Sequence, residues 1–437
     1  MLVLGLISLT GYIERLFLAD FSKEAWAGAL NGFFLARIFQ AACLAVVVVG
    51  QAFVGLYHGS NQPKQIGPCV WQLIWFSILS MFLVVPCGFL FQHLLFADTV
   101  LASTESQYFS ILCFSNFLFV LGGALSAFYL GRGKTKVVVV LTIGCSLLNI
   151  GLDYLLIFGW RFIPTLGAAG AAWGRVLAQV VLCGILLTLF LKRSNQEAYA
   201  THQWKLSTNR FWHYIRPGSL RAFAAFFALG DWVLVSRLMS LNSETHASVF
   251  DMGSTIFYFL TFIGDGIYQT TVTMASNQMG KKDYSQVWAS FYSGIAFVLI
   301  FGVILAIPFF FFKEVFIIGF KDSSFYPQSA SIFNLMSPWL WLSVVAYGFN
   351  TVMTGFLVAA RDTKFILAFF TVLWVFSLLP VYLTMNVLNV SPGLFWMIVM
   401  GTNLVVSLSF LWRASQEKWK QDNWQLRLPL PESLPSV

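Results

Sequence analysis

The sequence predicts an all-α polytopic membrane protein, with twelve transmembrane helices in two six-helix lobes related by internal duplication. Three observations lead to this prediction. The 437-residue chain is 58% hydrophobic and only 10% charged, which is too apolar for a soluble globular protein. Its apolar runs are long enough to cross a hydrocarbon layer of roughly 30 Å. Finally, the order of these runs in the first half of the chain recurs in the second half.

Hydrophobic runs separated by polar turns are the expected membrane spans. Each contains few charged residues, so each can form a helix whose backbone hydrogen bonds are satisfied within the membrane. The expected spans are 2–19, 26–55, 69–95, 107–130, 137–160, 167–191, 215–239, 247–279, 285–312, 328–358, 365–388 and 394–412.

The second six spans repeat the first six. An offset of 222 residues pairs Pro86 with Pro308, an offset of 221 pairs the basic turns, and an offset of 228 pairs Lys136 with Lys364. An even number of spans per repeat gives both copies the same orientation. We therefore expect an N-terminal lobe at 1–191, a cytosolic inter-lobe loop at 192–213, a C-terminal lobe at 214–412 and a cytosolic tail at 413–437.

The basic residues indicate the topology. Seventeen of the 26 lysines and arginines fall on one side of the predicted spans, and only Lys23, Arg161, Lys313 and Lys321 fall on the other. By the positive-inside rule, we expect both termini to lie in the cytosol. The expected location of the chain is the cytoplasmic (inner) membrane. Because the net charge of +8 is accounted for by topology, we expect membrane lipid around the chain and no nucleic-acid partner.

An acid in the fifth span is the first candidate functional residue. Asp153 is the only acidic or basic residue between Val137 and Trp160. A charge near the bilayer centre costs on the order of 3 kcal/mol, so such a residue is a functional candidate by default. Asn149 lies four residues earlier, which places its amide on the same helix face as the Asp153 carboxylate. An alternative is a purely structural hydrogen bond between the two.

With Asp153 included, the predicted spans contain equal numbers of acids and arginines, five of each, which suggests pairing. Glu14 lies in the first span, and Arg175 in the sixth is expected either to pair with Asp153 or to contact an anionic group. Asp251 and Asp265 lie 14 residues apart, nearly four helical turns, and so share a face of the eighth span. A paired carboxylate stays ionised, whereas a desolvated acid without a partner can hold a proton.

Several longer motifs resemble one known family. They are EAWAGALNG, which opens the second span, QAFVGLYHGSNQ after it, GRGKTK after the fourth, LLNIGLDYLLIFG in the fifth and PTLGAAGAAWGR leading into the sixth. Together they resemble the multidrug and toxic compound extrusion transporters, of the multidrug, oligosaccharidyl-lipid and polysaccharide exporter superfamily. The resemblance extends over nearly the whole chain.

This resemblance implies a two-lobed exporter that exchanges a substrate for protons or sodium ions. In the family, an acid of the first span and an Asn-x-x-x-Asp pair of the fifth form the cation site, which correspond here to Glu14, Asn149 and Asp153. Sodium, if used, is expected at Asn149 and Asp153. Arg175 replaces a small hydroxyl residue that is common in the family. The C-terminal lobe departs further, because the acid that some members carry in the seventh span falls near Phe226.

The expected function is therefore cation-coupled antiport of small organic, cationic or amphipathic compounds by alternating access. The alternative is a flippase of a lipid-linked precursor from the same superfamily. Two lobes of this kind commonly enclose a cavity near the membrane midplane, and the expected cavity or counter-charge residues are Arg37, Gln51, Arg175, Asp251 and Asp265. We expect a monomer with a small-molecule substrate and no cofactor beyond the coupling ion.

Other classes of protein fit less well. An ATP-driven pump would need G-x-x-x-x-G-K-[ST], but Phe128 takes the place of the first glycine before Gly133–Thr135. An intramembrane enzyme would need histidines or cysteines beside an acid or nucleophile. The five histidines lie mostly in loops or at span ends, so we do not expect an enzyme.

Overall fold

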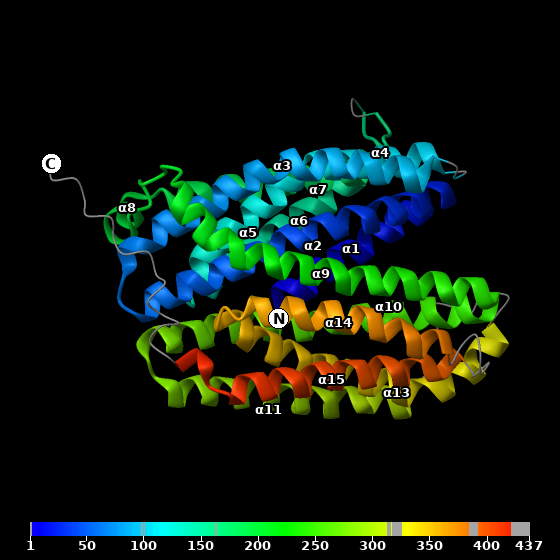
Figure 1. Ribbon diagram of the computed structural model, residues 1–437. Helices are drawn as coiled ribbons and strands as arrows, with labels where there is room; N and C mark the ends of the chain where they lie inside the picture. The colour runs from blue at the N-terminus through cyan, green and yellow to red at the C-terminus, as the bar shows by residue number, and fades with distance from the viewer. Residues whose placement is uncertain are drawn as a thin grey trace. The chain divides into compact units, whose positions relative to one another are not determined.

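The computed structural model describes residues 2–97, 99, 101–161, 164–312, 316, 326–383 and 392–420. Within these ranges the regular elements are helices and no strand occurs. The long helices are α1 (Leu2–Phe21), α2 (Lys23–Gly59), α3 (Ile66–Phe96), α4 (Ala102–Phe114), α5 (Asn116–Leu130), α6 (Thr135–Phe158), α7 (Ala168–Phe190), α9 (Thr208–Asn242), α10 (Glu244–Lys281), α11 (Tyr284–Phe311), α13 (Tyr326–Ala359), α14 (Thr363–Tyr382) and α15 (Phe395–Ser415) (Figure 1).

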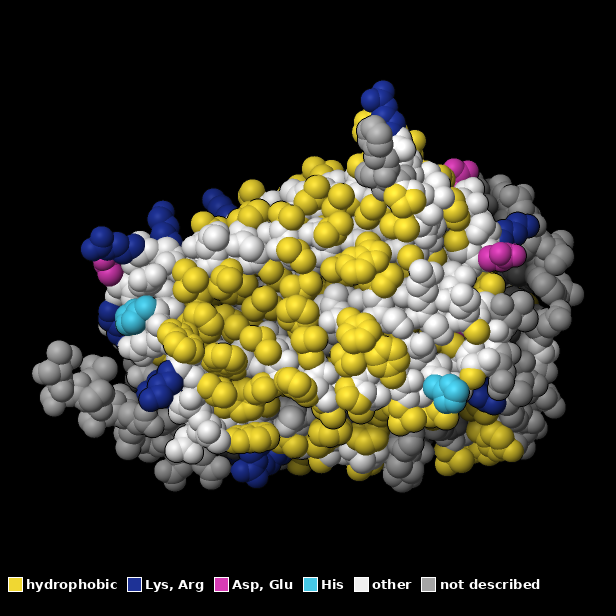
Figure 2. All heavy atoms as spheres, turned by 90° about the horizontal axis from the view of Figure 1, so that it is seen from above, with side chains coloured by type: hydrophobic (Ala, Val, Ile, Leu, Met, Phe, Trp, Pro, Cys, Tyr) yellow, Lys and Arg dark blue, Asp and Glu magenta, His cyan; other side chains and the backbone are white. Residues whose placement is uncertain are grey.

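Each predicted span corresponds to one of these helices, with α4 and α5 sharing the fourth span, so the predicted all-α architecture is confirmed. Seven described helices are long and apolar enough to cross a membrane, and eight if the α4–α5 pair, bent by 41°, counts as one span. Figure 2 shows why a membrane suits this surface: hydrophobic side chains cover much of the face in view, and charged ones lie mainly toward its ends. The tail beyond residue 420 lies outside the described residues.

The helices form two compact units. Unit 2 contains Leu2–Ala222 together with Ser276–Lys282, and unit 1 contains Phe223–Ala275 and Asp283–Val437. The division falls inside α9 and near the end of α10, while the lobe boundary expected within 192–213 remains a prediction.

The segment that follows α7 is hydrogen-bonded to α3 within unit 2. It contains the short helix α8 (Arg193–Tyr199) and then runs along α3. The indole nitrogen of Trp71 donates to the carbonyl of Thr201 at 2.7 Å, and that of Trp75 donates to the carbonyl of Trp204 at 2.8 Å. Side chains of α3 thus satisfy backbone carbonyls that no helix satisfies.

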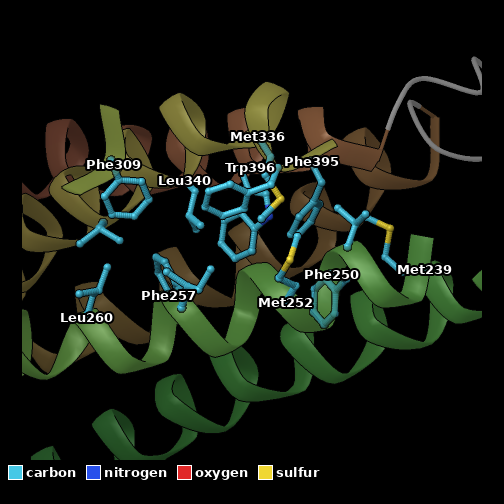
Figure 3. Packing of buried hydrophobic residues seen from close by; sticks show 14 of the residues in the cluster. Met239, Phe250, Met252, Phe257, Leu260, Phe309, Met336, Leu340, Phe395 and Trp396 are labelled. Atoms are coloured by element: carbon cyan, nitrogen blue, oxygen red, sulfur yellow. The ribbon is translucent and has the colours of Figure 1, made fainter. Parts of the chain in front are cut away.

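A large aromatic core stabilises unit 1. Trp396 of α15 is completely buried and packs against Phe257 of α10, with ring centroids 5.5 Å apart, and Phe309 belongs to the same cluster (Figure 3). Phe333 is also fully buried. Gly253 makes this packing possible, since a Cβ there would overlap with the Trp396 ring. Small residues let helices approach closely in a membrane, where van der Waals packing is the main attraction between them.

In unit 2, small residues bring α7 against α6. A Cβ at Gly170 would overlap with the backbone of Leu156, and one at Gly174 would overlap with the Asp153 carboxylate. The GAAGAAWGR stretch therefore presents a smooth face on which α6 can lie. This close packing places Arg175, the next residue on α7, beside the buried acids.

Candidate functional site

The buried charges of unit 2 meet in one cluster. Glu14 of α1 is 3% exposed and Asp153 of α6 is completely buried. Arg175 Nη2 of α7 forms an ion pair with Glu14 Oε2, and Tyr108 Oη of α4 donates a hydrogen bond of 2.8 Å to Glu14 Oε1. Glu14 therefore has a partner at each carboxylate oxygen.

Asp153 is held differently. Its Oδ1 accepts a hydrogen bond of 2.8 Å from Asn149 Nδ2, as the sequence spacing predicts, while its buried Oδ2 has no hydrogen-bond partner among the described residues. The charged groups that act on it electrostatically are Glu14 and Arg175. An ionised carboxylate left half-satisfied in a dry interior is costly, whereas the protonated acid is neutral.

The cluster thus contains two buried acids and one partly buried arginine. Arg15, adjacent to Glu14, is exposed and lies within electrostatic range of Glu14 and Arg175. With Asp153 protonated, the charges of Glu14, Asp153 and Arg175 sum to zero. With Asp153 ionised they sum to −1, which is expensive in a medium of low dielectric constant. The arrangement is suited to binding and releasing one cation at Asp153.

The ion pair differs in one respect from the expected one. Arg175 forms its ion pair with Glu14, whereas the sequence suggested Asp153 as the ionic partner. Glu14 has one methylene more than aspartate, which extends its carboxylate toward α7. Asp153 interacts with Arg175 only through the electrostatic field.

Arg175 also lines a pocket next to the cluster. Its side chain is 21% exposed, and its guanidinium carbon lies 4.8 Å from the Phe33 ring centroid, a cation–π contact. The pocket has a volume of about 240 Å³ that includes open solvent, and its lining includes Phe33, Arg37, Gln40, Asn116, Phe119 and Arg175. Arg37 Nη1 donates to Gln40 Oε1 at 3.2 Å.

The remaining candidates from the sequence lie elsewhere. Gln51 is buried in α2, next to the turn between α5 and α6, and does not line the pocket. Asp251 and Asp265 lie on α10 in unit 1, where Asp251 is exposed and Asp265 Oδ1 accepts a hydrogen bond of 2.8 Å from Tyr347.

Unit 1 has no charged counterpart of the cluster at the equivalent positions. The repeat offsets pair Glu14 with Ser236, Asp153 with Val381 and Arg175 with Asn403. Val381 is buried, and Asn403 takes part in a neutral hydrogen bond of 2.9 Å with Asn350. All three charges are thus present in one repeat and absent from the other, as expected if they work as a set.

Sequence reasoning missed two members of the site. Tyr108 sits in an apolar run like many other aromatic residues, and its contact with Glu14 depends on how α4 packs against its neighbours. Gly174 is recognisable only once Asp153 is seen against it. Among the described residues, no group of three or more His, Cys, Asp or Glu side chains is arranged to hold a metal ion.

A helical membrane protein built from two copies of a six-span repeat, with buried acids sharing an arginine in one copy, belongs to the class of duplicated membrane transporters. The sequence profile of the MatE family matches residues 1–155 and 223–383. The chain therefore belongs to the MatE family.

Curated relatives and solved structures agree with this assignment. The chain is 23% identical over 365 residues to the probable multidrug resistance protein NorM of Thermotoga maritima, covering 81% of this chain and 76% of the relative. For NorM of Listeria monocytogenes the identity is 20%, covering 95% and 92%. A MOP superfamily transporter from Pyrococcus furiosus superposes with a TM-score of 0.79 at 17% identity, covering 96% of this chain and 94% of that one. The Vibrio cholerae MATE transporter VcmN gives a TM-score of 0.80 at 14% identity, covering 97% and 96%.

Proposed function

We propose that the chain is a cation-coupled antiporter that exports small organic compounds, and that its coupling ion is a proton held by Asp153. The export function is supported by family membership and by the relatives described as multidrug resistance proteins. The observation that carries the coupling proposal is a fully buried carboxylate with one oxygen left without a partner, beside a Glu14–Arg175 ion pair.

The same geometry favours a proton over sodium. Hard cations such as Ca²⁺ and Mg²⁺ are held by six or more oxygen ligands, and we expect sodium also to need several. Asp153 offers only Oδ2 without a partner, and the neighbouring Asn149 presents its donor nitrogen to the carboxylate. The fixed positive charge of Arg175 already acts on Asp153. A proton needs only one oxygen, and it removes the charge that the site accommodates poorly.

Orientation follows from the charge distribution. The basic turns after α2, α5 and α10 lie in the cytosol by the positive-inside rule, and substrate enters from that side. Protonation of Asp153 from the opposite side is proposed to change the packing of α1, α6 and α7 and so to favour release. The coupling is reciprocal, so bound substrate lowers the affinity for the proton.

A test is efflux of a fluorescent amphipathic dye from proteoliposomes, with a pH gradient and a sodium gradient imposed separately. We expect the pH gradient to drive efflux and the sodium gradient alone to have no effect. Efflux driven by sodium at equal pH would overturn the assignment of the coupling ion. No efflux under either gradient would count against dye export as such.

One observation favours a second candidate, the flippase of a lipid-linked precursor. Arg37 and Arg175 line the same pocket, and two guanidinium groups suit a phosphate. Scrambling of a fluorescent phospho-isoprenoid lipid between leaflets in the same proteoliposomes, without any dye efflux, would favour this alternative.

Gly174 provides a steric test of the site. Gly174→Ala is expected to lower export strongly, because the new methyl group would overlap with Asp153 Oδ1. Gly184→Ala on the same helix is the matched control, since nothing lies within 4 Å of a Cβ there. Dye efflux at equal protein incorporation compares the two, and equal export would show that the Asp153 carboxylate need not stay where it is.

A further inference from the structure

The last turns of α10 cross α2 so closely that only glycine fits at the crossing. Residues Ser276–Lys282 belong to unit 2, together with α2. A Cβ at Gly59 would overlap with the carbonyl oxygen of Asn277 and lie 3.1 Å from Gly280 Cα. A Cβ at Gly280 would overlap with the carbonyl oxygen of Leu56 and lie 3.0 Å from Gly59 Cα. Backbone therefore touches backbone at this point.

These contacts are reciprocal under the sequence repeat. The offset of 221 residues pairs Gly59 with Gly280 and Leu56 with Asn277. The contact of Gly59 with Asn277 is thus the same contact as that of Gly280 with Leu56, made a second time. Such self-complementary contacts are the signature of a twofold interface. Here a local twofold relates two helix ends of one chain.

Hydrogen bonds and deep burial both support the crossing. Asn277 Nδ2 donates to the carbonyl oxygen of Gly131, in the basic turn after α5, at 2.6 Å. The hydroxyls of Tyr57 on α2 and Tyr214 on α9 lie 2.8 Å apart and form a buried hydrogen bond. Residues 49–57, just before the end of α2, are all buried.

We propose that the Gly59–Gly280 crossing is the cytosolic gate of the transporter, and that these helix ends part each time substrate enters from the cytosol. The proposal rests on the proposed export function and on the cytosolic placement of the basic turns. A glycine crossing suits a gate, because it closes tightly through van der Waals contact between backbones. The hydrogen bond from Asn277 to the Gly131 carbonyl must break when it opens. A reciprocal contact joins one repeat directly to the other, so it must break when the repeats separate at this end.

A bulky side chain at Gly59, here called the wedge variant, tests the proposal through the accessibility of a buried thiol and needs no transport assay. In a chain whose six native cysteines are replaced, Ser276→Cys introduces a thiol at a completely buried position. We expect slow reaction with a membrane-impermeant maleimide added from the cytosolic side, and much faster reaction when Gly59→Leu prevents closure. Gly144→Leu is the matched control, because a Cβ at Gly144 meets nothing within 4 Å. Unchanged labelling in Gly59→Leu would overturn the proposal.

A cross-link provides the opposite test, and it serves if the wedge variant fails to fold. A Cβ at Gly55 would lie 3.0 Å from Ser276 Cβ, close to the roughly 3.5–4.5 Å that a disulfide requires. Oxidised Gly55→Cys/Ser276→Cys should export much less than the same variant after reduction, while Ser276→Cys alone should export equally under both conditions. Full export by the cross-linked protein would show that the helix ends never part. If the parent chain itself exports nothing, the proposed function fails, and the maleimide assay still decides on the gate.

Discussion

Replacement of Arg175 by methionine is expected to give the largest loss of stability of any single change in the cluster. The variant leaves Glu14 buried without its cation, and breaking a buried ion pair in this way costs about 3–5 kcal/mol. The remaining hydrogen bond from Tyr108 and uptake of a proton by Glu14 reduce that cost. Thermal unfolding of the purified protein in detergent, followed by tryptophan fluorescence, measures the difference.

A double variant distinguishes the cost of leaving Glu14 unpaired from the contribution of the ion pair itself. Glu14→Gln combined with Arg175→Met removes both charges, so no unpaired charge stays buried, and most of the lost stability should return. Export should remain low in the double variant, because the arginine that acts on Asp153 is gone. If Arg175→Met were as stable as the parent chain, the ion pair would not be a significant support of this site.

Replacement of Asp153 by asparagine is expected to abolish export driven by the pH gradient while leaving the protein folded. The asparagine side chain has nearly the same shape, and its carbonyl oxygen can still accept the hydrogen bond from Asn149. The buried groups then stay neutral and can neither take up nor release a proton. Dye efflux should fall to the rate of protein-free liposomes, with thermal stability unchanged or higher.

Asp20→Asn is the matched control for this variant. Asp20 lies in the last turn of α1 and is exposed, so the same chemical change there should leave export intact. Retained pH-driven efflux in Asp153→Asn, at the level of Asp20→Asn, would remove Asp153 from the coupling mechanism.

Much of this architecture could be predicted because the membrane leaves few alternatives. Long apolar runs must form helices in lipid, so the spans followed from hydropathy alone. Asn149 and Asp153 could be paired from their spacing, because helix geometry fixes which residues share a face. The importance of Glu14 and Arg175 was also foreseeable, since each charge within a span needs a reason to be there.

What could not be predicted depends on how separate helices pack. The choice of Glu14 over Asp153 as the ionic partner of Arg175 is set by the positions of α1 and α7, which no local pattern reveals. Tyr108 and Gly174 have the same limitation. The reciprocal crossing of Gly59 and Gly280 is an intermediate case: the duplication made their equivalence visible, but not their contact.

Proton release on substrate binding is the sharpest test of whether Asp153 holds the coupling proton. Purified protein in weakly buffered solution containing a pH indicator receives a saturating concentration of a transported dye. We expect the parent chain and Asp20→Asn to release protons on binding, whereas Asp153→Asn should bind the dye and release none. Equal release from Asp153→Asn and the parent chain would show that another group holds the proton.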